Sequence, residues 1–208
     1  MRSSDTKSPR KPGGPRIVGG VHRGRRLVAP PGELVRPTSD RAREALFNIL
    51  SHGNFAALGL HFAERPVLDA FAGTGALGLE ALSRGASAAA FIESEREALN
   101  ALRRNVGALG LSDRAQIVRG DATRPPRATF ACAVAFLDPP YGSGLAAPAL
   151  GALAAAGWLT EDALVVIEVA AREDLPMPAG FTLLDERVYG AARLVFLRRE
   201  FLGRERAP

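Results

Sequence analysis

From residue 65 onward, short apolar runs alternate with stretches of helical periodicity. The apolar runs lie at residues 66–71, 88–93, 115–119, 131–137 and 163–169, and the helical stretches at about 76–84, 95–107 and 144–156. Such alternation is typical of parallel strands joined by right-handed helical crossovers, with helices on both faces of the sheet. We therefore predict an α/β protein with a three-layer, Rossmann-like arrangement around a mostly parallel sheet.

The C-terminal part departs from this alternation. Residues 181–188 and 191–198 flank Tyr189-Gly190, which predicts an antiparallel hairpin at the edge of the sheet. Two helix boundaries are also predicted further upstream: Ser94 and Glu97 have the spacing of a capping box, and Gly85 follows the end of an earlier helix.

Positive charge is concentrated at the N-terminus. Residues 1–43 contain 11 Lys and Arg against 3 acidic residues, whereas the rest of the chain contains 16 and 19. A basic segment beside a nearly neutral body indicates a polyanionic partner, most often nucleic acid. We expect residues 1–15 to be a disordered basic tail and residues 16–35 a basic β-hairpin extension that binds RNA. Its strands would be residues 17–20 and 26–28, with residues 22–25 as the tip.

The remaining main domain is predicted at residues 36–200, followed by a tail at 201–208. It would open with a helix from about Ser39 to Ser51, because five apolar residues there fall on one helical stripe. The preceding residues Pro37-Thr38-Ser39-Asp40 supply a helix start signal.

Composition narrows the class of protein. The single cysteine, Cys132, rules out a disulfide framework, and the three histidines are scattered without the spacing of metal ligands. We found no apolar run of membrane-spanning length and no signal peptide. We therefore expect a cytoplasmic, metal-free, monomeric protein with one core.

A glycine-rich loop follows the first strand of the alternating part, and acidic residues end the next two strands. Glu93 lies 20 residues after Gly73, where a carboxylate can accept ribose hydroxyls, and Asp121 could read an adenine edge. The glycines allow a tight turn and close approach of a ligand to the backbone. The predicted cofactor-binding residues are Asp69, Phe71, Ala72, Gly73, Thr74, Gly75, Glu93, Asp121 and Ala122.

The spacing Gly73-x-Gly75-x-x-Gly78 also matches the dinucleotide fingerprint, which makes NAD an alternative cofactor. The loop begins about 70 residues into the chain, behind a basic extension, and the chain has no Tyr-x-x-x-Lys dyad. A P-loop is excluded because no Lys-Ser/Thr follows the last glycine. S-adenosylmethionine, which has a ribose and an adenine but no pyrophosphate, fits this pattern better.

The tetrapeptide Asp138-Pro139-Pro140-Tyr141 follows the fourth apolar run. It falls where ligands bind in open α/β sheets, beyond the carboxyl ends of the strands. A carboxylate and proline carbonyls can accept hydrogen bonds from an NH2 group, and an aromatic ring offers a flat face to a base. We predict these four residues as the catalytic group, with Asp138 and the Pro139 carbonyl as the acceptors.

Longer motifs resemble one family. Residues 69–86, beginning Asp69-x-Phe71-Ala72-Gly73, resemble the first motif of the RsmD-type small-subunit ribosomal RNA guanine-N2 methyltransferases. Residues 36–48, 16–20 and 23–25 are similar to other segments of that family.

The resemblance implies a class I methyltransferase fold with a seven-stranded sheet, S-adenosylmethionine as cofactor, and methylation of a guanine N2 amine in 16S ribosomal RNA. The acceptor would be the RNA or the assembling small subunit. It also favours a role for Arg41, Arg43 and Phe47 near the cofactor or the base. The predicted RNA-binding residues are Arg16, Arg23, Arg25, Arg26 and Arg36.

Several alternatives remain open from the sequence. The chemistry also suits an adenine-N6 or cytosine-N4 DNA methyltransferase, although 208 residues leave little room for a target-recognition domain. Another RNA amino-methyltransferase, a protein glutamine methyltransferase, an NAD oxidoreductase, and an inactive methyltransferase fold that only binds nucleic acid were the other possibilities.

Overall fold

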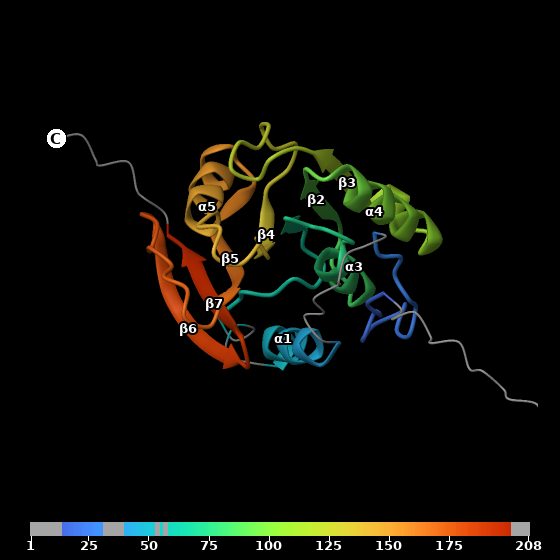
Figure 1. The fold of residues 1–208 in the computed structure, drawn as a ribbon, viewed down its shortest axis with the longest axis horizontal. Coiled ribbons are helices and arrows are strands. Elements are labelled where there is room, and N and C mark those ends of the chain that lie inside the picture. The colour runs from blue at the N-terminus through green and yellow to red at the C-terminus, as the bar shows by residue number, and fades with distance from the viewer. Residues whose placement is uncertain (1–13, 31–39, 53–54, 56–57, 201–208) are drawn as a thin grey trace, which may run out of the picture.

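The computed structural model describes residues 14–30, 40–52, 55 and 58–200 (Figure 1). Most of the tail predicted at residues 1–15, the tail predicted at 201–208, Arg36 and most of the helix start signal lie outside these residues. Within the described part, no helix combines the length and the apolar character needed to cross a bilayer.

The centre of the molecule is one seven-stranded sheet with the order β3-β2-β1-β4-β5-β7-β6. β1 to β5 pair in parallel, and β7 pairs antiparallel with both β5 and β6. This confirms the mostly parallel sheet with an antiparallel C-terminal hairpin. The strands are β1 (Val67–Ala70), β2 (Ala89–Glu93), β3 (Ala115–Arg119), β4 (Cys132–Leu137), β5 (Leu159–Ala170), β6 (Phe181–Tyr189) and β7 (Ala192–Arg199).

Helices cover both faces of this sheet and confirm the three layers. α1 (Asp40–His52), α3 (Ala76–Ser83) and α4 (Arg96–Ala108) pack on one face, and α5 (Ala146–Ala155) packs on the other (Figure 1). The central strands β1, β2 and β4 are buried along their whole length, as expected for strands covered on both sides. A short 3₁₀ helix (Ser112–Arg114) precedes β3.

The strand order reverses between β1 and β4, which lie side by side at the centre of the sheet. At such a switch point the loops after the two strands diverge and leave a crevice at the carboxyl ends. The glycine loop after β1 and the Asp138–Tyr141 motif after β4 therefore face the same crevice. This relationship positions the site.

The predicted N-terminal hairpin forms, but its regular pairing is limited to one antiparallel bridge between Arg16 and Arg26. Ile17 N–H donates to the Arg25 carbonyl (2.9 Å) and Leu27 N–H donates to the Pro15 carbonyl (2.8 Å), so the two segments are hydrogen-bonded to each other. The amides that face away from this pairing are bound by helices: Val18 N–H donates to Glu80 Oε2 of α3 (2.7 Å) and Val28 N–H donates to Asn105 Oδ1 of α4 (2.7 Å). We call residues 14–30 the extension.

Close contact with the end of α3 explains two of the four glycines of the extension, Gly19 and Gly20. A side-chain carbon on Gly20, whose φ is +73°, would lie 1.9 Å from the carbonyl oxygen of Ser83. One on Gly19 would lie 2.4 Å from the Arg84 guanidinium. The extension is thus fitted against the C-terminal end of α3. It also begins earlier than the predicted boundary at residue 16, since Pro15 is buried.

The predicted capping box at the start of α4 was also wrong. Glu95 is the N-cap residue and makes no side-chain cap, and the Ser94 and Glu95 amides donate instead to Glu93 Oε1 (2.7 and 2.8 Å). The prediction at the end of α3 is confirmed, because Gly85 follows the last helical turn with φ +107°.

Candidate cofactor and acceptor site

A cavity of about 680 Å³ opens at the carboxyl ends of the parallel strands. This volume is in the usual range for small-molecule sites. The cavity is lined by most of the predicted site residues: Asp69, Phe71, Ala72, Gly73, Thr74, Glu93, Asp121, Ala122, Asp138, Pro139, Pro140 and Tyr141. Gly75 is the one predicted site residue of this group that does not line it.

The glycines of the loop have different structural roles. A side-chain carbon on Gly73, whose φ is +53°, would meet no atom within 4 Å, so its backbone faces open space in the cavity. One on Gly75 would lie 2.4 Å from Leu102, and one on Gly78 would lie 2.4 Å from Phe91. Gly73 therefore leaves room for a ligand, whereas Gly75 and Gly78 allow the loop and α3 to pack closely against Leu102 and Phe91.

Phe71 carries unusual backbone geometry. Its φ of +61° is rare for a bulky residue, and it lies directly after β1, where the chain turns into the glycine loop. Such outliers concentrate at ligand sites, since the surrounding structure must hold them in place.

Glu93 ends β2 and organises the loops beside it. Its Oε2 accepts the Gly73 N–H (2.6 Å), and its Oε1 accepts two amides at the start of α4. A carboxylate has about four acceptor positions, so these three bonds leave room on Oε2 for one more donor. One ribose hydroxyl fits that position without displacing an existing bond.

Asp69 lies inside β1 and is buried below the glycine loop. Its Oδ2 accepts the Gly78 N–H (2.8 Å), which ties the first turn of α3 to the sheet. Burial raises the pKa of Asp69 well above its usual range, and the nearby Asp138 and Glu93 charges act in the same direction. Asp69 thus holds the glycine loop and the start of α3 against β1 through this hydrogen bond.

Asp121 follows β3 at the outer side of the cavity. Its Oδ1 accepts the backbone N–H (2.8 Å) and the hydroxyl (2.7 Å) of Thr123. These hydrogen bonds lower the pKa of Asp121, which keeps the carboxylate charged and able to accept a ligand donor.

The acceptor side of the cavity is built by the ends of β4 and β5. Tyr141 donates its hydroxyl hydrogen to Glu168 Oε1 (2.6 Å), and Gly142 N–H donates to Glu173 Oε2 (2.9 Å). Two carboxylates from β5 and the turn after it therefore hold the loop that contains the Asp138–Tyr141 motif. Both Asp138 and Glu168 line the cavity.

Eleven of the lining residues are not among the cofactor-binding and catalytic residues predicted from the sequence, and they include Pro15, Arg43 and Glu168. Glu168 had a detectable signal, because it is the one charged residue in the apolar run 163–169. The family resemblance favoured a place for Arg43 near the cofactor or the base, and Arg43 does line the cavity, whereas Pro15 had no signal because it reaches the cavity through tertiary contacts.

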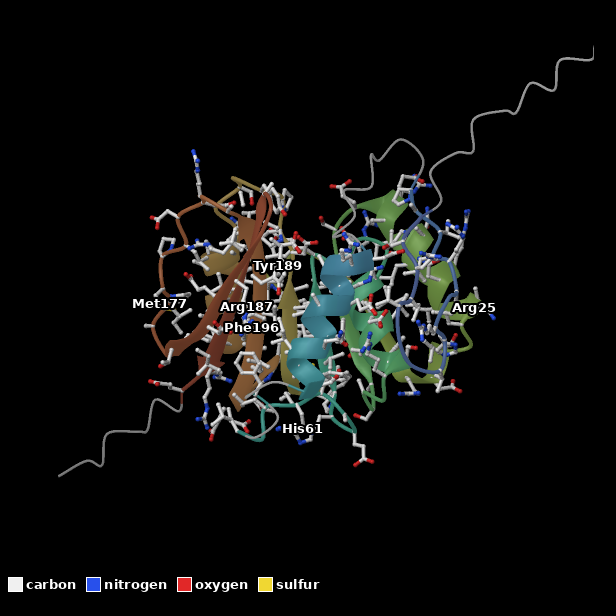
Figure 2. The ribbon with its side chains drawn as sticks, turned by 90° about the horizontal axis from the view of Figure 1, so that it is seen from below. Arg25, His61, Met177, Arg187, Tyr189 and Phe196 are labelled. Atoms are coloured by element: carbon white, nitrogen blue, oxygen red, sulfur yellow. The ribbon has the colours of Figure 1, made fainter. Side chains whose placement is uncertain are left out.

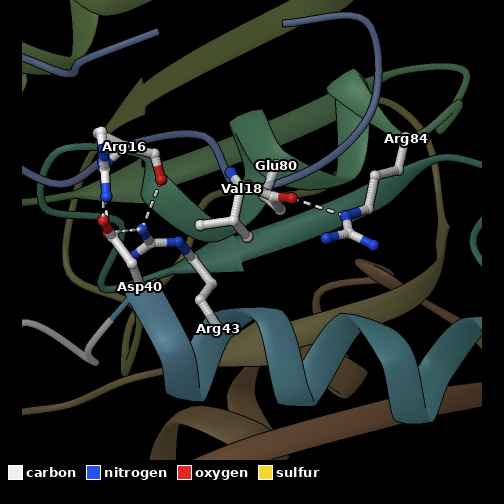
Figure 3. A network of polar contacts seen from close by, with 6 residues as sticks. All are labelled: Arg16, Val18, Asp40, Arg43, Glu80 and Arg84. Atoms are coloured by element: carbon white, nitrogen blue, oxygen red, sulfur yellow. Dashed lines mark hydrogen bonds and ion pairs between the residues drawn. The ribbon is translucent and has the colours of Figure 1, made fainter. Parts of the chain in front are cut away.

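Arg43 lies at the junction between the extension and the site (Figure 3). Its side chain is only 2% exposed, and its Nη2 donates to the Arg16 carbonyl (2.6 Å) and to Asp40 Oδ1 (2.8 Å). Asp40 also accepts the backbone N–H and Nε of Arg16 (3.2 and 3.1 Å). Burial acts to raise the pKa of Asp40, but the bonds from Arg16 and the Arg43 charge outweigh it and lower that pKa.

A second polar link in the same view joins the extension to α3 (Figure 3). Glu80 is fully buried and accepts the Val18 N–H through Oε2 and Arg84 Nε through Oε1 (2.6 Å). Phe47, considered above near the ligand, instead lies in the core, with its ring 5.5 Å from Phe62 and 5.6 Å from Phe136.

The arginines predicted to bind RNA are not equivalent. Arg16 is engaged by Asp40, and Arg25 donates to the Ala108 carbonyl (2.9 Å). Arg23 and Arg26 are exposed, and neither makes an ion pair with any described residue.

Comparisons with known proteins agree with this geometry. The model of the family described as "Conserved hypothetical protein 95" matches residues 15–198. "Ribosomal RNA small subunit methyltransferase D" of Escherichia coli is 36% identical over 90% of this chain and 91% of its own length. The Haemophilus influenzae protein of the same name is 35% identical over 88% of this chain and 93% of its own. The chain belongs to this RsmD family.

A solved structure supports the same assignment. An Escherichia coli protein that is 36% identical superposes with a TM-score of 0.73, covering 89% of this chain and 97% of its own. This RsmD-family chain is therefore a class I methyltransferase, and its cofactor is S-adenosylmethionine.

The site fits that cofactor on its own chemistry. The open space at Gly73, the remaining acceptor position on Glu93 and the charged Asp121 match a ligand with a ribose and an adenine. Among the described residues, no group of three or more His, Cys, Asp or Glu is arranged to hold a metal ion.

Proposed function

We propose that this methyltransferase modifies the exocyclic N2 amine of a guanine in small-subunit ribosomal RNA. The observation that carries the proposal is the single cavity shared by the glycine loop, Glu93 and the Asp138–Tyr141 motif. It brings a cofactor-sized space and a set of amine acceptors together at one switch point. The names of the Escherichia coli and Haemophilus influenzae relatives support ribosomal RNA as the acceptor.

The cofactor would be held by the residues after β1, β2 and β3. Glu93 and the Gly73 backbone would take the ribose side, Asp121 and Ala122 the adenine side, and Asp69 would keep the loop in position. The bound cofactor supplies a methyl group on positively charged sulfur.

The chain's own contribution is to hold the amine. The guanine N2 amine is a poor nucleophile because its lone pair is delocalised into the ring. The Asp138 carboxylate and the Pro139 carbonyl would each accept one N–H, which orients the nitrogen and favours a pyramidal geometry. Tyr141 would stack on the base, a contact that contributes about 1–3 kcal/mol. Positioning and electrostatics would then supply most of the rate.

The extension would bind the surrounding phosphates. A base paired in a helix must be unpaired or flipped to enter such a cavity, at a cost of a few kcal/mol. Arginines on the extension would offset part of this cost by salt-dependent phosphate contacts. In this proposal residues 16–35 act as the RNA-binding part and residues 36–200 as the methyltransferase domain.

A methyl-transfer assay tests the proposal. The full chain and radiolabelled S-adenosylmethionine would be incubated separately with deproteinised 16S RNA, small subunits, duplex DNA and total protein. We expect label in 16S RNA or small subunits, released as N2-methylguanosine after digestion. Label only in DNA would favour the adenine-N6 or cytosine-N4 alternative, and label only in protein would favour a glutamine methyltransferase.

A further inference from the structure

Two exposed arginines on α4 lie beside the extension. Arg103 and Arg104 occupy the solvent face of this helix. The extension reaches the same helix at two points, where Arg25 Nη2 donates to the Ala108 carbonyl (2.9 Å) and Val28 N–H donates to Asn105 Oδ1 (2.7 Å). The arginines of both segments therefore belong to one side of the molecule.

None of Arg23, Arg26, Arg103 and Arg104 forms an ion pair with a residue that the structure describes. The acidic residue of α4, Glu97, is in its first turn, about 10 Å along the helix axis from Arg104. Unpaired guanidinium groups are suited to phosphate, which they can bind in a bidentate manner.

The opposite side of the molecule differs. On the C-terminal hairpin, Arg187 pairs with Asp185 and Arg193 pairs with Glu186. Figure 2 shows Arg25 and Arg187 on opposite sides of the molecule. The C-terminal hairpin thus balances these two arginines with carboxylates, whereas the four arginines of the extension and α4 have no such partner among the described residues.

The same helix leads to the site. Ala98, near the start of α4, lines the cavity, whereas Arg103 and Arg104 lie one to two turns further along. A helix of 13 residues is about 20 Å long, which spans several phosphates of a nucleic-acid strand. RNA that inserts a base into the cavity would therefore meet α4 with its flanking backbone.

We propose that the RNA-binding surface includes the exposed face of α4 as well as the extension. We call it the extension–α4 surface, and define it by Arg23, Arg25, Arg26, Arg103 and Arg104. Its ligand is the phosphate backbone of RNA next to the modified base, so the inference rests on the proposed function and deepens it. The contacts would set affinity and register without reading sequence.

The test compares two double variants of the full chain with equal loss of charge. R103Q/R104Q removes the α4 arginines, and R187Q/R198Q removes two exposed arginines from the C-terminal hairpin. Glutamine keeps α4 helical. Binding of a fluorescent 16S RNA fragment would be measured from 50 to 300 mM salt, together with the affinity for S-adenosylmethionine and the melting temperature.

We expect R103Q/R104Q to weaken RNA binding at least five-fold near 0.15 M salt. The slope of log Kd against log salt should become shallower by up to about two, one for each lost phosphate contact. R187Q/R198Q should change the RNA affinity by less than two-fold and should leave the slope nearly unchanged. Both variants should bind the cofactor like the parent protein.

Equal RNA affinity and slope in the two variants would overturn the assignment of α4. This result is distinct from failure of the proposed function. If the parent enzyme labelled no ribosomal RNA, the proposed substrate would be wrong, whereas loss of the α4 effect with intact RNA methylation would reject the surface alone.

Discussion

Tyr141 donates its hydroxyl hydrogen to Glu168 Oε1 over 2.6 Å, so a carboxylate near the end of β5 holds the ring of the Asp138–Tyr141 motif. Glu168 is 7% exposed and lines the cavity beside that ring. If Tyr141 stacks on the base, then Glu168 acts as a positioning residue, because the hydrogen bond restricts the ring to one orientation.

A double-mutant cycle tests this pair. Tyr141→Phe and Glu168→Ala should each lower kcat/KM for RNA by about ten- to a hundred-fold, since a hydrogen bond to a charged group contributes about 1.5–3 kcal/mol. The double variant should be little worse than either single one, because both remove the same bond. Glu168→Gln should recover part of the loss through its amide oxygen, whereas fully additive losses would contradict the coupling.

Asp138 should be essential for transfer but not for cofactor binding. Removing its carboxylate in Asp138→Ala takes away one of the two acceptors proposed for the amine. We expect a loss of about 10²–10³-fold in the single-turnover rate, the size seen when one preorganised charge-stabilising group is removed. Calorimetry should give a cofactor affinity within a few-fold of the parent. A turnover close to normal would reject the assignment.

The raised pKa of Asp69 predicts a pH-dependent stability difference. In the native state this carboxyl keeps a proton that the unfolded chain releases near pH 3.8, so its contribution to the free energy of unfolding falls as pH rises above that value. Asp69→Asn cannot titrate at this position. In urea denaturation, the free energy of unfolding of the variant relative to that of the parent should therefore increase with pH, by at most about 1.4 kcal/mol per pH unit. A constant difference from pH 4 to 8 would contradict the shift.

Two glycines of the extension form a matched pair for testing its packing. Gly20 and Gly24 both have positive φ (+73° and +86°), but a side-chain carbon would clash with Ser83 only at Gly20. Gly24→Ala should cost about 1–2 kcal/mol for the left-handed backbone alone. Gly20→Ala should cost clearly more in the free energy of unfolding. Equal costs would mean that the extension moves freely away from α3.

Much of the fold and of the candidate site could be predicted from the order of strands and helices along the chain. Once the alternation established a parallel sheet, Asp69, Glu93 and Asp138 had to meet at one edge, because the carboxyl ends of parallel strands do. Local signals also gave the terminal hairpin and the end of α3. These features depend on residues close together in sequence or on topology alone.

The differences concern backbone amides that are bound by side chains other than the predicted ones. Glu93, directly before Ser94, binds the Ser94 and Glu95 amides in place of the predicted capping box, and Glu80 and Asn105 bind the Val18 and Val28 amides of the extension. The bonds to Glu80 and Asn105 join residues 62 and 77 positions apart, so they cannot be seen in a short window of sequence. The role of Glu168 could have been inferred from a single charge within a buried strand, which needs a buried partner.

Asn105 joins two parts of the protein through one amide group. Its Nδ2 donates both to Val28 of the extension (3.0 Å) and to Thr74 of the glycine loop (2.9 Å), while Pro15 forms part of the cavity wall. Removing residues 1–28 would remove the hydrogen-bond partners that Glu80 and Asn105 have in the extension, and it would remove Pro15 from the cavity wall. The N-terminal segment is consequently not an interchangeable cassette: a chimera that took it from a distant homologue without the matching α3 and α4 should lose the hydrogen bonds to Glu80 and Asn105 and, with Pro15, part of the wall of the methyl-donor pocket.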